Sequence, residues 1–119
     1  MLAVTNQEKK IKLLSSVIKN LEEKSEVESN LQSSTALAHA LILRSDAYLE
    51  LNQIPNALND IDRAIDMDTL NGKAWRIKAD AEELAGNFAN AIQSLNNWCY
   101  DNPEMITKVK RDIVRLSNK

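Results

Sequence analysis

The side chains that most often catalyse reactions or bind metal ions are scarce in this chain. His39 is the single histidine and Cys99 is the single cysteine. A nucleophilic cysteine needs a nearby base, and a catalytic zinc ion needs three protein ligands. The two residues are expected on different helical hairpins, with Cys99 packed in the core. The sequence therefore predicts neither a Cys–His dyad nor a histidine metal site.

A group of aspartates resembles a calcium-binding segment at first sight. The four residues are Asp60, Asp62, Asp66 and Asp68. They lack the glycine and the terminal glutamate of a calcium loop, so we expect them to form a solvated acidic face. No glycine-rich loop that could hold a phosphate is present either. We expect no metal and no cofactor, and the protein is predicted not to be an enzyme.

Composition narrows the class of protein further. The chain has 119 residues, 44% of them hydrophobic and 27% charged, with a net charge of −2. These values favour one globular domain over a disordered tail. The slightly acidic balance disfavours nucleic-acid binding, and no run approaches the roughly 20 apolar residues of a membrane span. The simplest expectation is a soluble protein in the reducing cytoplasm.

Apolar residues recur at intervals of three and four, as in Ile11, Leu14 and Ile18. This is the spacing of amphipathic helices, and only two Gly and two Pro interrupt the chain. Short turns between helices favour antiparallel hairpins, and the long polar connection after the first helix is predicted to be a loop. The pattern predicts six helices, over about 6–24, 35–51, 55–67, 72–85, 88–100 and 103–117.

An internal repeat becomes visible when the chain is shifted so that Leu41 falls on Trp75. We call this shift the repeat period. Small residues then fall on small residues, and large apolar residues fall on large ones. The matching pairs are Leu41 with Trp75, Ser45 with Ala79, Asn52 with Gly86, Ile54 with Phe88, Ala57 with Ala91, and Ile61 with Leu95. Small residues are expected where two helices approach closely, and large ones where a hairpin needs filling.

This alternation, with its period of about 34 residues, resembles the tetratricopeptide repeat (TPR). The copy at 72–105 matches the family better than the copy at 38–71, although Trp98 stands where a small residue is usual. The resemblance implies an all-α fold in which antiparallel helical hairpins stack as a short right-handed superhelix. It divides a single domain, 1–119, into a half repeat 6–24, a loop 25–34, repeats 35–70 and 71–102, and a capping helix 103–117. Four basic residues would form the solvated face of that last helix, namely Lys108, Lys110, Arg111 and Arg115.

In TPR proteins the first helix of each hairpin lines a concave groove. The resemblance points twelve residues into that groove: His39, Ile42, Leu43, Asp46, Leu49, Glu50, Lys73, Arg76, Ile77, Asp80, Glu83 and Leu84. Their pattern is an apolar strip with an acidic rim, which suits an amphipathic partner segment with basic flanks. The alternative for the apolar members is that they pack against neighbouring helices. Changing Leu43 and Ile77 to Asp is expected to abolish partner binding while leaving the helices intact.

Many relatives of this family grip the C-terminal carboxylate of Hsp70 or Hsp90 with a clamp of polar residues. The resemblance aligns Leu43 with the clamp Asn and Ile77 with the clamp Arg, so only Lys73 matches. Each charge-assisted hydrogen bond is worth about 1.5–3 kcal/mol, whereas a micromolar complex totals about 8 kcal/mol. The loss of two such bonds argues against a chaperone tail as the partner.

Three functions follow from this interpretation. The leading one is a non-catalytic adaptor, scaffold or complex subunit that binds a protein segment in the groove. The second is a co-chaperone with a degenerate clamp. The third is a structural module completed by self-association as a homo-oligomer, because the half repeat lacks its first helix. On that view Ile11, Leu14 and Ile18 would present an apolar face without a cover.

Overall fold

Helices make up nearly all of the residues that the computed structural model describes, which are 6–27, 31–67 and 72–118. The described elements are α1 (Asn6–Val27), α2 (Leu31–Glu50), α3 (Ile54–Met67), α4 (Gly72–Leu84), α5 (Phe88–Asp101), a 3₁₀ turn η1 (Pro103–Met105) and α6 (Ile106–Ser117). No β-strand occurs in those ranges, which confirms the all-α prediction.

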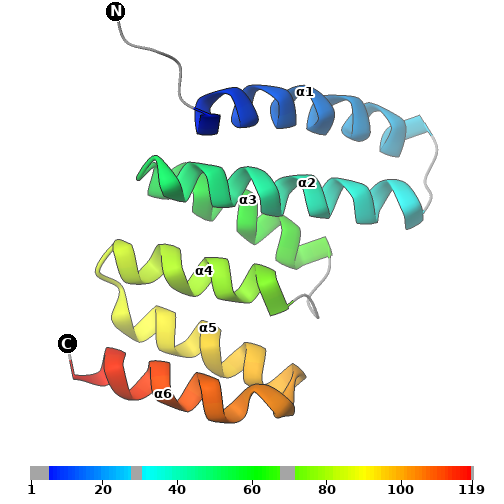
Figure 1. Cartoon of the computed structure of the whole chain (residues 1–119). Helices are drawn as coiled ribbons and strands as arrows, with labels where there is room; N and C mark the ends of the chain where they lie inside the picture. Colours follow the sequence, from blue (N-terminus) through cyan, green and yellow to red (C-terminus); the bar gives the residue numbers. More distant parts are fainter. Residues whose placement is uncertain (1–5, 28–30, 68–71, 119) are drawn as a thin grey trace, which may run out of the picture.

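The helices stack in chain order (Figure 1), from α1 at one end of the molecule to α6 at the other. Each helix packs against the next, and α2 also contacts α4, which follows it in the next hairpin. The result is a slab of 44 × 44 × 18 Å. None of the helices in the described part of the chain is long and apolar enough to cross a membrane.

The two central hairpins turn in the same way, at positions one repeat period apart. Asn52 ends the turn after α2 with φ of 58°, and Gly86 ends the turn after α4 with φ of 83°. In both turns the amide that follows this residue donates to the carbonyl five residues earlier, over 2.8 Å. This is the Schellman arrangement, which closes a helix through a left-handed residue that favours Gly or Asn. The sequence match between Asn52 and Gly86 therefore marks the same structural position.

Gly86→Ala should destabilise the protein by about 1–2 kcal/mol, because an L side chain at a positive φ is strained even in open space. Asn52→Gly is the matched control, since both residues tolerate this conformation, and it should change stability little. Urea unfolding followed by circular dichroism measures both. Equal costs for the two substitutions would contradict the assignment of the turns.

Two hydrophobic clusters form the core. The first is built from α1, α2, α3 and the start of α4, and the second from α4, α5 and α6. Trp75 is half-buried and packs against both. Within the first hairpin the buried Ser45 hydroxyl donates to the carbonyl of Ala57, over 2.9 Å. Ala79 and Ala91 occupy the equivalent positions in the second hairpin and are also buried.

The predicted loop 25–34 is wrong for most of its length. α1 continues to Val27 and α2 begins at Leu31, so only residues 28–30 lie outside the described helices. The segment contains neither Gly nor Pro, and its glutamates, glutamine and leucine are good helix formers. Polar composition alone did not distinguish an extended helix from a loop.

The expected bare apolar face of α1 is also corrected. Ile18 is buried in the first cluster and Leu14 packs against that cluster, so α2 covers this face. Among the side chains of α1 whose burial the structure describes, the exposed large apolar ones are Leu13 and Val17.

Asp60 does not belong to a solvated acidic face. Its carboxylate is almost fully buried and accepts two hydrogen bonds from Arg44, each 2.6 Å long. This contact raises the pKa of the Arg44 guanidinium. Asp62 and Asp66 are exposed, as predicted, and Asp68 lies outside the described residues.

Asp60→Asn should cost about 3–5 kcal/mol of stability, because it leaves the Arg44 guanidinium without its carboxylate inside the protein. Asp62→Asn, two residues away on α3, is the control. Asp62 pairs with Lys78 but is half-exposed, so its loss should cost less than about 1 kcal/mol. Thermal unfolding compares the two variants, and similar melting temperatures would rule out a structural role for the buried pair.

Candidate functional site

Six of the twelve residues predicted to line the groove surround one shallow depression. It lies between the C-terminal halves of α2 and α4 and has a volume of about 360 Å³. Its lining residues are Asp46, Leu49, Glu50, Asp80, Glu83 and Leu84. We call this set the acidic depression. Helices α2 and α4 hold equivalent places in successive hairpins, so residues one repeat period apart are brought side by side.

Only part of the predicted apolar strip is accessible at the surface. Ile42 and Ile77 are 1% and 5% exposed and belong to the first hydrophobic cluster, so they are not available to a partner. Leu43 is half-buried. His39 and Lys73 are exposed, but neither lines the acidic depression. Ile42 and Ile77 are buried because α2 and α4 pack against each other and against their neighbours.

The exposed apolar surface instead comes from Leu84, which is 58% exposed, together with the half-buried Leu49. Four carboxylates flank these leucines, and part of their charge is already paired. Glu83 accepts hydrogen bonds of 2.6 and 3.0 Å from Arg115 of α6, and Glu50 accepts one from Gln7 of α1. The carboxylate of Asp46 has no partner among the described residues.

Arg76 is not free to bind a partner, because carboxylates of the protein itself surround its side chain. Its guanidinium bonds to Asp112 of α6 and lies 3.6 Å from Asp80. The Arg76–Asp112 and Arg115–Glu83 pairs fasten α6 to α4. A predicted groove residue therefore serves as an attachment for the last helix.

The acidic depression has an unfavourable concentration of negative charge. Glu50 is the last residue of α2, and Glu83 and Leu84 are the last two of α4, so the carboxylates lie where helix dipoles are also negative. Burial raises the pKa of the Asp80 carboxyl above its ordinary value of 3.8, against the opposing effect of Arg76. The neighbouring carboxylates of Glu83 and Asp112 add to the rise. This arrangement favours a positively charged occupant.

Asp80→Asn should stabilise the free protein at pH 7 relative to the wild type. The pKa of Asp80 is higher in the folded than in the unfolded state, so its contribution to stability is complete below about pH 3.8 and is lost as the pH rises through the folded value. Since Asp80 is half-exposed, the gain should stay below about 1 kcal/mol. Urea titrations between pH 3.5 and 7 should show the difference growing with pH. Asp66→Asn on α3 is the control, and a difference independent of pH would contradict the assignment.

One set of groove positions was missed by the sequence analysis. Thr107, Lys110, Arg111 and Val114 line a further shallow depression, of about 540 Å³, on α6. They lie one repeat period after Lys73, Arg76, Ile77 and Asp80, so the same shift would have identified them. The capping-helix interpretation placed Lys110 and Arg111 on a solvated face, and both are exposed.

The three residues that the sequence alignment placed at the clamp positions differ in accessibility. Lys73 is exposed, Leu43 is half-buried, and Ile77 is enclosed in the core. The apolar residues thus leave Lys73 as the sole matching donor at the aligned positions. Nothing at Leu43 or Ile77 can hydrogen-bond a carboxylate through its side chain.

The remaining reactive side chains, His39 and Cys99, lie on α2 and α5, which are not neighbours in the stack. His39 is exposed on α2, whereas Cys99 is partly buried on α5 and packs against the second cluster. In residues 6–27, 31–67 and 72–118, no group of three or more His, Cys, Asp or Glu side chains could hold a metal ion.

Stacked hairpins with small residues at the crossings and left-handed turn residues one repeat period apart define the fold of a tetratricopeptide repeat domain. A solved structure confirms this fold, namely the TPR2B domain of yeast Sti1 in its complex with pHsp70. The match covers 92% of this chain and 97% of that one, with a TM-score of 0.64 and 20% sequence identity. No protein-family model matches the chain, and no curated protein matches it in sequence.

Proposed function

We propose that this protein is a non-catalytic interaction module, an adaptor or complex subunit of the cytoplasm, that binds a segment of a partner protein at the acidic depression. The observation that carries the proposal is the combination of an exposed leucine, Leu84, with four carboxylates at the ends of two neighbouring helices. The fold supports it, because the similar TPR2B domain was solved with a bound protein partner.

The chemistry of the acidic depression defines the segment that would fit. Leu49 and Leu84 offer contact area for apolar side chains, and Asp46 offers a site for a lysine or arginine. The negative ends of α2 and α4 add to the attraction for a cation. An amphipathic segment with one or two apolar anchors and basic flanks meets all three conditions.

A display selection of random peptides against the purified chain tests this proposal. Enriched peptides should combine Leu, Ile or Phe with Lys or Arg. The double variant Asp46→Lys, Glu50→Lys should weaken their binding at least about tenfold, mainly through a slower association rate. Fluorescence anisotropy at several salt concentrations measures this, and the salt dependence of binding should become smaller in the variant.

The matched control is Asp66→Lys, Glu104→Lys, which changes the net charge equally at two exposed positions outside the acidic depression. Peptides that bind this control and the groove variant equally well would refute the assignment of the site. The Leu43→Asp, Ile77→Asp variant is unsuitable, because an aspartate at the buried position 77 would unfold the first cluster.

The co-chaperone hypothesis can be tested in the same assay. The neighbouring domain's complex with pHsp70 favours it, whereas Leu43 and Ile77 disfavour it. A peptide that ends in EEVD should bind weakly or not at all, and carboxylate-dependent binding that requires Lys73 would favour a degenerate clamp. Sedimentation over a range of concentrations tests self-association, the third hypothesis.

A further inference from the structure

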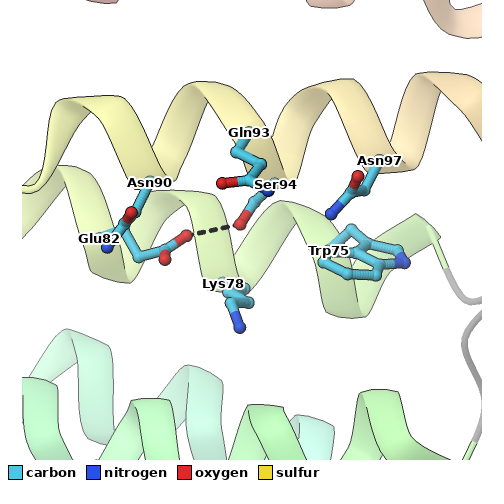
Figure 2. Close-up of a pocket in the computed structure, with 7 residues that line it drawn as sticks. All are labelled: Trp75, Lys78, Glu82, Asn90, Gln93, Ser94 and Asn97. Atoms are coloured by element: carbon cyan, nitrogen blue, oxygen red, sulfur yellow. Dashed lines mark hydrogen bonds between the residues drawn. The ribbon is translucent and has the colours of Figure 1, made fainter.

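A third pocket lies on the side of α4 that faces away from the acidic depression. It has a volume of about 310 Å³. Trp75, Lys78 and Glu82 line it from α4, and Asn90, Gln93 and Asn97 line it from α5 (Figure 2). The spacing of each set, three or four residues, places its members on one helix face. The three amides of α5 are exposed, so the pocket opens to solvent along that helix.

Glu82 is the unusual member of this pocket. It is only 7% exposed, and one of its carboxylate oxygens accepts a hydrogen bond of 2.6 Å from the Ser94 hydroxyl. No lysine, arginine or histidine pairs with it in the part of the chain that the structure describes. A buried carboxylate normally requires a cation or several hydrogen bonds to offset the loss of hydration.

Lys78 does not supply that cation. Its amine pairs with Asp62 of α3 at 2.6 Å, and Figure 2 shows it pointing away from the Glu82 carboxylate. The amine also lies 6.0 Å from the centre of the Trp75 ring. Lys78 thus lies between Trp75 and Glu82 along α4, and its amine leaves the Glu82 carboxylate without a cation.

In the preceding hairpin, the protein itself supplies a cation for the buried carboxylate at the corresponding position. The residues one repeat period before Lys78 and Ser94 are Arg44 and Asp60, which form the buried bidentate pair. In that hairpin the acid stands on the second helix, and an arginine of the first helix reaches it. In the next hairpin the acid stands on the first helix, at Glu82, and Ser94 replaces the aspartate. The second hairpin therefore also contains a buried carboxylate, but no arginine of that hairpin pairs with it.

We propose that this pocket binds the guanidinium group of an arginine side chain presented by a partner protein. The Glu82 carboxylate would pair with the guanidinium, and the amide oxygens of Asn90 and Gln93, which lie on the Glu82 side of the pocket in Figure 2, would accept its remaining N–H groups. The planar, forked guanidinium suits this set of acceptors better than a compact ammonium does, and Trp75 and Asn97, at the opposite end of the pocket, would contact the rest of the bound segment. This site is independent of the acidic depression, so either proposal can fail without the other.

Nuclear magnetic resonance titration with the peptide acetyl-Gly-Arg-Gly-amide tests the proposal. The Trp75 indole N–H and the side-chain amides of Asn90, Gln93 and Asn97 should shift in a saturable way at millimolar peptide. The citrulline peptide, which has nearly the same shape without the charge, should produce no saturable shift. Glu82→Gln should weaken binding of the arginine peptide by about tenfold or more, whereas Glu83→Gln, on the groove side of α4, should not.

A second variant, Gln93→Glu, tests the proposal even if Glu82→Gln fails to fold. Gln93 is exposed, so the substitution preserves the core, and the added carboxylate should tighten binding several-fold. The proposal is overturned if the arginine peptide causes no saturable shift at the side-chain amides of Asn90 and Gln93. It is equally overturned if Glu82→Gln binds as tightly as the wild type, or if Glu83→Gln weakens binding as much as Glu82→Gln does.

Discussion

The architecture depends on two helix crossings at which only small side chains separate the neighbouring helices. Ser45 and Ala57 form the first crossing and Ala79 and Ala91 the second, and all four residues are buried. A larger residue at either crossing would force the helices apart and strip contacts from the core beside it. Since the small residues of the two crossings lie one repeat period apart, the two hairpins present equivalent faces, and carboxylates of α2 and α4 line one depression.

The sequence reveals those features of the fold that depend on local spacing. The repeat period, the small residues and the left-handed positions at Asn52 and Gly86 are all patterns along the chain. The extent of α1 and α2 was underestimated, because polar helix formers without Gly or Pro are compatible with both a loop and a helix. The burial of Asp60 was missed because its partner is 16 residues away and the pair forms only when α2 and α3 pack.

The same distinction, between local spacing and long-range packing, explains which candidate-site residues were predicted correctly. A helix face can be inferred from spacing, and this is why six predicted residues surround one depression. Where that face ends is decided by packing against neighbours, so Ile42 and Ile77 were drawn into the core. The groove positions of α6 were accessible in principle through the repeat period. The pocket at Glu82 was not, because its character depends on where the Lys78 amine turns.

The position of α6 in the stack determines how further repeats could be added to this protein. Val109 lies one repeat period after Trp75 and two after Leu41, and it is buried in the second cluster, so α6 occupies the position of a first helix in a further repeat. A tandem duplication of residues 72–105 would therefore add one whole hairpin and keep α6 in the position of a first helix. An insertion of part of a repeat within a helix would instead rotate the residues that follow and turn their groove side chains away from the shared face. The unit of growth for this protein is thus a whole repeat, and the groove would lengthen in step with it.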